Sequence, residues 1–178
     1  KTPIDSKLNF KLENCNKLNI LKVPHTHKPN KAMSAQQITE LPNTDAIYKD
    51  LSQLGSKIIL IGRHAVKSSN FFNCDIRNIK NLEKTIKVIS KKYSKIDGFV
   101  HCAGANQCIK SEKIKISDWE DVLSVNLTSA FIISKEIKKN LRKSKNPSIV
   151  FISSIAGHRK SIVSGVHYVA SKAGLIGM

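Results

Sequence analysis

Three side chains near the carboxyl end of the chain have types and spacing suited to proton transfer: Ser154, Tyr168 and Lys172. Tyr168 and Lys172 are four residues apart, so on a helix they share a face. A phenol titrates near 10, and a neighbouring ammonium favours the phenolate and lowers that pKa. Tyr168 could then give a proton to a carbonyl oxygen or take one from an alcohol. Ser154, fourteen residues earlier, can hydrogen-bond the same oxygen and stabilise a developing alkoxide.

Such a reaction also needs a hydride, which a cofactor must supply because no side chain can. A tyrosine four residues before a lysine is a weak signal by itself, since roughly one residue in seven of this chain is lysine. Ser154 could equally be a loop hydroxyl, and Asn126, in the middle of an expected helix, could be a polar residue facing water. The interpretation therefore depends on the elements around these residues.

Apolar runs and amphipathic stretches alternate from Thr44 onward. Asp45 can cap a first helix that Gly55 ends, and Ser117 can cap a long one. Continuous apolar runs indicate strands buried on both faces. The pattern predicts a helix between Asp45 and Gly55, further helices at 79–93, 118–143 and from about 168, and strands at 57–61, 71–74, 98–101 and 148–152. Alternation of this kind predicts an α/β fold with a parallel sheet covered by helices on both faces.

Ligands of such sheets bind beyond the carboxyl ends of the strands. The residues with useful chemistry fall at those ends: Arg63 after the first strand, Asp75 after the second, 102–104 after the third and Ser153-Ser154 after the fourth. The sequence therefore predicts that they meet at one edge of the sheet.

Four segments in this order resemble the motifs of the short-chain dehydrogenase/reductase family, over about three quarters of the chain from about Ala46 onward. They are Cys102-Ala103-Gly104, Ser124-Val125-Asn126-Leu127-Thr128, Ile152-Ser153-Ser154-Ile155-Ala156-Gly157 and Tyr168-Val169-Ala170-Ser171-Lys172-Ala173-Gly174. The resemblance implies a Rossmann-like doubly wound parallel sheet and an NAD(P)-dependent oxidoreductase that interconverts a ketone and a secondary alcohol.

By the same resemblance Asn126, Ser154, Tyr168 and Lys172 form a catalytic tetrad, with Asn126 holding a water that relays protons to Lys172. Lys172 would also hydrogen-bond the nicotinamide ribose. Asp75 would lie near the adenine, and Ala103-Gly104 under the cofactor. Fatty-acid reductases that act on 3-oxoacyl thioesters share these motifs, as do sugar, steroid and polyol enzymes. The implied partner is a small carbonyl or alcohol substrate, and family members are often dimers or tetramers.

The choice of cofactor follows from the end of the first strand. A carboxylate there would bind a ribose 2′-hydroxyl and repel a 2′-phosphate. This strand ends Ile61-Gly62-Arg63-His64, and Arg63 can pair with a phosphate, although it could also be a surface arginine. We therefore expect NADP(H) rather than NAD(H).

The chain departs from the family's pattern before Gly55, at 101–102 and at its carboxyl end. No glycine precedes Gly55, where the family has a first strand and a glycine-rich turn, and His101-Cys102 stands where it usually has two asparagines. We expect a partial Rossmann-like domain at 44–178, without that strand and turn and without the C-terminal strands, after a poorly ordered or atypical segment at 1–43. A partial sequence or faulty gene model, a divergent enzyme, and a catalytically silent or repurposed binding protein all remain open.

The net charge of +17 would suit a polyanion, but 26 of the 30 basic residues are lysines scattered along the chain. That distribution favours a compositional bias over a nucleic-acid site, which leans on arginine and aromatics. The four cysteines fit no zinc spacing, so no metal is expected, and they suit a reducing compartment. No apolar run could span a membrane. We expect a cytoplasmic location, with organelle targeting left open.

Overall fold

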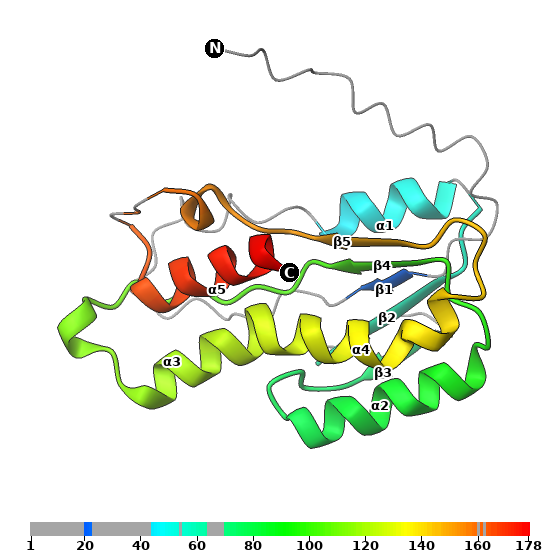
Figure 1. Cartoon of the computed structure of the whole chain (residues 1–178), viewed down its shortest axis with the longest axis horizontal. Helices are drawn as coiled ribbons and strands as arrows, with labels where there is room; N and C mark the ends of the chain where they lie inside the picture. The colour runs from blue at the N-terminus through cyan, green and yellow to red at the C-terminus, as the bar shows by residue number, and fades with distance from the viewer. Residues whose placement is uncertain (1–19, 23–43, 54, 64–69, 160, 162) are drawn as a thin grey trace, which may run out of the picture.

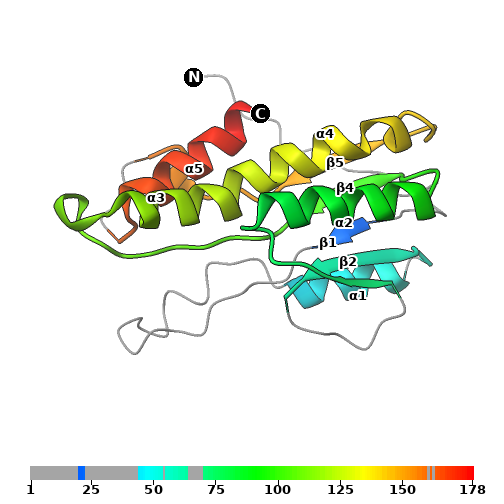
Figure 2. The same ribbon diagram turned by 90° about the horizontal axis from the view of Figure 1, so that it is seen from below.

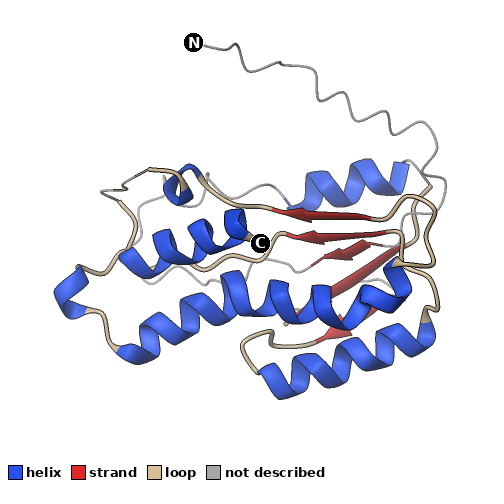
Figure 3. Cartoon of the chain, viewed as in Figure 1, coloured by secondary structure: helices blue, strands red, loops and turns tan. Residues whose placement is uncertain are grey.

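The computed structural model describes residues 20–22, 44–53, 55–63, 70–159, 161 and 163–178. Parallel strands alternate with helices along the chain, which confirms the predicted α/β class (Figures 1 and 3). The N-terminal segment 1–43, interpreted as poorly ordered, lies outside the described residues apart from Ile20–Lys22. Among the described helices, none is long and apolar enough to cross a membrane.

Four strands form where the apolar runs predict them: β2 (Ile58–Gly62), β3 (Phe71–Asn73), β4 (Gly98–His101) and β5 (Ser148–Phe151). Every residue of β2 and β4 is buried, as a strand covered on both faces requires. β2 pairs in parallel with β3, and β4 in parallel with β5. The carboxyl ends of all four strands therefore point the same way.

The structure contains a strand that the sequence reasoning did not predict. β1 (Ile20–Lys22) pairs in parallel with β2, and it lies between β2 and β4 in the sheet (Figure 1). The expected absence of a strand before β2 is thus wrong. The short apolar pair of this strand lies among lysines and asparagines, with no continuous apolar run to mark it, which is why the pattern missed it.

Helices cover both faces of the sheet (Figure 2). α1 (Thr44–Gln53) packs its residues Ile47 and Leu51 against one face, and Gly55 follows it with the positive φ of 74° that the predicted helix end requires. α2 (Ile79–Lys92) and α4 (Ser129–Leu141) cover the other face. Together these layers confirm the doubly wound arrangement.

The long helix expected at 118–143 is three segments in the structure. α3 (Ile116–Leu123) is followed by a π-helical turn, η3 (Ser124–Thr128), and then by α4. The helix begins at Ile116, so the predicted cap at Ser117 is wrong. The Asp118 carboxylate instead accepts a hydrogen bond from the backbone N–H of Lys115, 3.0 Å away, and satisfies the first turn.

The chain then returns through β5 to a one-turn helix, η4 (Ile155–Gly157), and to α5 (Val166–Gly177). η4 packs directly on α5: a Cβ at Gly157 would lie 2.8 Å from the backbone of Lys172. Only glycine permits this approach, which sets α5 against the segment that follows β5.

Candidate active site

The predicted site residues collect at the carboxyl ends of the strands, as expected. Ser154 follows β5, while Tyr168 and Lys172 lie on α5, which runs beside that strand's end (Figure 1). Asn126 lies in the π-helical turn. Contacts within hydrogen-bonding distance connect α5 both to β5 and to this turn, so the structure brings these elements into one site.

Lys172 is the most unusual residue of this group because its ammonium is buried. Its side chain is 2% exposed, and Nζ donates a hydrogen bond of 2.7 Å to the backbone oxygen of Ile152, just beyond β5. Nζ also lies 5.7 Å from the centre of the Tyr168 ring. Burial lowers the pKa of Lys172 to about 8, and the nearby Cys102 opposes that shift. The expected pairing of Tyr168 with Lys172 on one helix face is therefore present.

Ser154 is held at the start of η4. Its Oγ accepts a hydrogen bond of 3.2 Å from the backbone N–H of Ala156, which fixes the hydroxyl at the strand end. A hydroxyl in this role can still donate its own proton to another oxygen. Ser153, next to it, donates to the backbone oxygen of Lys172 at 2.8 Å. The two serines thus have different tasks, one capping η4 and one fastening β5 to α5.

Asn126 is fully buried, so the alternative of a residue facing water is wrong. Its Oδ1 accepts from the backbone N–H of Ala105 at 2.6 Å, and its Nδ2 donates to the Ala105 oxygen at 3.0 Å and to Ser171 Oγ at 2.8 Å. Ser171 Oγ in turn donates to the backbone oxygen of Tyr168. Asn126 therefore clamps the loop after β4 to the helix that carries Tyr168 and Lys172.

The π-helical turn explains how a helix residue can do this. The backbone N–H of Ser129 bonds to the oxygen of Ser124, five residues earlier, instead of four. The extra residue widens the turn, and such turns occur frequently at functional sites. The sequence does not indicate this geometry, because an asparagine in a π-helical turn looks the same in sequence as one in a regular helix.

A second group of charged residues lies beyond β2 and β3. Arg63 Nη1 is 3.8 Å from the carboxylate of Asp75, and both side chains are about one third exposed. Arg77 binds the same carboxylate through two nitrogens, with its shortest contact at 2.6 Å, and also lies 3.6 Å from Asp121. The hydrogen bonds from Arg77 lower the pKa of Asp75. The structure thus brings Arg63 and Asp75 together, and adds Arg77, which the sequence reasoning missed.

Ala103 and Gly104 continue from β4 and are buried. They leave the strand at the same edge as Arg63, Asp75 and Ser154, so the five positions predicted from strand ends share one side of the sheet. Within the described ranges no cluster of three or more His, Cys, Asp and Glu side chains could hold a metal ion.

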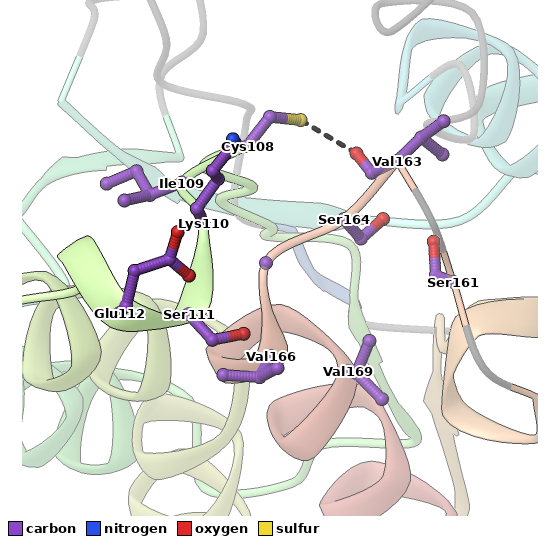
Figure 4. Close-up of a pocket in the computed structure, with 11 residues that line it drawn as sticks. Cys108, Ile109, Lys110, Ser111, Glu112, Ser161, Val163, Ser164, Val166 and Val169 are labelled. Atoms are coloured by element: carbon purple, nitrogen blue, oxygen red, sulfur yellow. Dashed lines mark hydrogen bonds between the residues drawn. The ribbon is translucent and has the colours of Figure 1, made fainter.

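A pocket of about 530 Å³ opens beside the start of α5 (Figure 4). One wall is the segment from Cys108 to Glu112. The other is formed by Ser161, by Val163–Val166 and by Val169, the residue after Tyr168. Cys108 Sγ donates to the Val163 oxygen at 2.8 Å and His167 Nε2 lies 3.4 Å from Gln107 Oε1, so both contacts join the two walls. The lining includes four apolar side chains, namely Ile109, Val163, Val166 and Val169.

The family model for short chain dehydrogenases matches residues 45–178. The chain is 30% identical over 143 residues to the 3-oxoacyl-[acyl-carrier-protein] reductase FabG of Buchnera aphidicola, covering 80% of this chain and 57% of that protein. It is 34% identical over 144 residues to the FabG of Rickettsia felis, covering 75% of this chain and 57% of the relative. The chain thus spans little more than half the length of these curated relatives.

Solved structures share the fold. The aldohexose dehydrogenase of Thermoplasma acidophilum superposes with a TM-score of 0.74 at 24% identity, covering 90% of this chain and 58% of that one. A Brucella ovis oxidoreductase in complex with a partially ordered NAD superposes with a TM-score of 0.75 at 20% identity, covering 90% of this chain and 74% of that one. Because the family model spans most of the chain and its motifs meet at one edge of the sheet, this protein belongs to the short-chain dehydrogenase family.

Proposed function

We propose that this chain is the cofactor-binding and catalytic part of an NAD(P)-dependent oxidoreductase that interconverts a ketone and a secondary alcohol. The observation that carries the proposal is the buried Lys172 ammonium, fastened to Ile152 beyond β5 and lying 5.7 Å from the Tyr168 ring. A positive charge at that distance favours the phenolate form of a tyrosine. Tyr168 is then suited to exchange a proton with a substrate oxygen near neutral pH.

Each remaining residue of the tetrad has a task that its contacts support. Ser154, fixed by its bond with Ala156, would donate a hydrogen bond to the substrate oxygen that Tyr168 protonates. Asn126 would keep Tyr168 and Lys172 in place through Ser171. A proton lost by Tyr168 would be replaced through Lys172, whose pKa of about 8 lets it exchange protons near neutral pH.

The residues at the strand ends fit a nicotinamide cofactor, which supplies the hydride when bound. Arg63 can meet a 2′-phosphate beyond β2, and Arg77 neutralises the Asp75 carboxylate that would otherwise repel it. Ala103 and Gly104, with small or absent side chains, allow a flat ring system to approach the backbone. These contacts favour NADP(H) over NAD(H).

The pocket in Figure 4 suggests the kind of substrate. Its apolar side chains Ile109, Val163, Val166 and Val169 suit an acyl chain, and it begins one residue from Tyr168. The curated relatives named above are reductases of 3-oxoacyl groups on acyl carrier protein. A 3-oxoacyl thioester is therefore the substrate class that we propose to test first.

The test is NADPH oxidation with acetoacetyl-coenzyme A as the probe, comparing the wild type with Tyr168→Phe and Tyr93→Phe. Tyr93 OH bonds to Asn70 at the amino end of β3, away from the carboxyl ends of the strands, so its loss serves as the control. We expect Tyr168→Phe to abolish turnover while NADPH still quenches the protein's fluorescence with unchanged affinity. Turnover by Tyr168→Phe would refute the catalytic assignment.

One feature favours a second candidate, a catalytically silent Rossmann-like binding protein with affinity for a polyanion: no glycine precedes Gly55 to form a phosphate-binding turn. Saturable protection from heat unfolding by NADPH supports the enzyme, whereas protection only by RNA or heparin supports the silent protein. The cytoplasmic location and a homo-oligomeric state stay predictions from the sequence and the family.

A further inference from the structure

A second titratable side chain is buried behind the site and has no part in the tetrad. His101 is the last residue of β4 and is 0% exposed. Within the described part of the chain, neither ring nitrogen has a partner in full hydrogen-bond geometry. The backbone groups of Val125 and Asn126, in the π-helical turn, act to raise the pKa of the His101 ring.

The position of His101 links it to Lys172 twice. The backbone oxygen of His101 accepts from the N–H of Ile152, whose own oxygen accepts from Lys172 Nζ. The charge of Lys172 also acts on the ring: burial is the larger cause and the Lys172 ammonium the second cause that lower the pKa of His101 to about 4. His101 is therefore neutral at physiological pH, and its two ring nitrogens are buried in the same region as the Lys172 ammonium.

A neutral imidazole has one N–H donor and one lone-pair acceptor. Each costs free energy when it is buried without a partner, and an internal water commonly satisfies such groups. The ammonium of Lys172 has three protons and the structure assigns one of them, to Ile152. The backbone carbonyls of the π-helical turn suit the imidazole donor, which leaves the second nitrogen as an acceptor facing the cation.

We propose that His101 is a positioning residue for Lys172: its neutral ring donates to the backbone of the π-helical turn and accepts from the Lys172 ammonium through one buried water. The ring would hold the ammonium beneath Tyr168 and stabilise its charged form. This inference rests on the proposed function, because Lys172 must remain charged to favour the Tyr168 phenolate. The other titratable groups that face the pair are Cys102, the residue after β4, and Tyr168, on α5.

The first test does not depend on turnover. Two-bond ¹H–¹⁵N spectra of the whole chain report the tautomer and protonation of each of the six histidines, and the signal missing from His101→Asn identifies His101. We expect a single neutral tautomer with one hydrogen-bonded acceptor nitrogen. In Lys172→Met that nitrogen should move to the position of a free acceptor, and the pKa of His101 should rise because the neighbouring cation is gone. Identical His101 signals in both proteins would overturn the proposal.

The second test measures the pKa of Lys172 from the alkaline limb of the pH dependence of kcat. His101→Leu removes one hydrogen bond to a charged group, so we expect the alkaline pKa to fall by about one unit, a tenfold loss of proton affinity. His101→Asn keeps a donor and an acceptor and should restore most of that shift. A purely structural role would lower the midpoint of heat unfolding and leave the limb unmoved, which would contradict the proposal. If no variant turns over any substrate, the proposed function fails, and the spectra alone still decide the role of His101.

Discussion

Replacing the buried lysine by an apolar side chain of similar length should make the protein more stable while removing its activity. Lys172 is 2% exposed, and burial lowers its pKa from 10.5 to about 8. At about 1.36 kcal/mol per pKa unit, this drop means that keeping Lys172 charged costs about 3 kcal/mol of folding free energy at neutral pH. Lys172→Met removes that cost.

The substitution also removes a favourable contact. The backbone oxygen of Ile152 loses its bond with Nζ, which costs about 1 kcal/mol. The difference leaves Lys172→Met more stable by about 2 kcal/mol, and for a chain of this length the midpoint of heat unfolding should rise by about 4–8 °C. The methionine chain can occupy the space of the lysine stem, so we expect no cavity.

The stability difference between Lys172→Met and the wild type should depend on pH in a defined direction. Between pH 8 and 10.5 folded Lys172 has lost its proton while the unfolded lysine has not, so the wild type gains stability as the pH rises through this window. The advantage of Lys172→Met should therefore be largest at pH 7 and shrink toward pH 10. Heat unfolding at both pH values measures it, with exposed Lys138→Met as the control. A variant less stable than wild type at pH 7, or a difference independent of pH, would refute the reasoning.

Three further predictions follow from the contacts. Asn126→Leu leaves both backbone groups of Ala105 without their partner, so urea unfolding should show a loss of at least about 2 kcal/mol; a smaller loss would mean that the clamp is weak. Gly165→Ala would place a Cβ 2.2 Å from the His167 ring and should lower the midpoint of heat unfolding, whereas Gly177→Ala, with open space, should not; equal effects would contradict the close packing. Arg63→Ala should weaken NADPH binding by about tenfold and leave NADH binding unchanged in fluorescence titrations, and equal losses for both cofactors would remove Arg63 from phosphate recognition.

Most strands and helices followed from the sequence, because the strands are continuous apolar runs and the helices have an apolar face of helical period. β4 matches its predicted range residue for residue, and α2, predicted at 79–93, buries the apolar face formed by Leu82, Ile86 and Ile89. β1 lies among lysines and asparagines, with no continuous apolar run to mark it. The π-helical turn at 124–128 lies inside the stretch predicted as one helix, and residue types alone do not distinguish such a turn from regular helix.

The site was predictable where motifs mark side chains, and not where contacts pass through the backbone. Arg63, Asp75, Ser154, Tyr168 and Lys172 lie at the expected strand ends or helix face. The positioning roles of two serines were missed: Ser153 bonds to a backbone oxygen of α5, and Ser171 joins Asn126 to another. Serine is common on surfaces, so its identity alone does not indicate such a bond. Arg77 offered a signal, because an arginine two residues from a carboxylate in a turn can bind it.

The buried ammonium also bears on whether the chain is an enzyme or a silent binding protein. Among the described residues Lys172 has no carboxylate partner, and its one assigned bond is to a neutral backbone oxygen. An apolar side chain would fill the same place between β5 and α5 at lower cost, by the net difference of about 2 kcal/mol derived above. A fold that needed only to pack α5 against the sheet would gain nothing from a cation there. A phenol that must release a proton near neutral pH does need one, and Tyr168 lies one helical turn away on the same face.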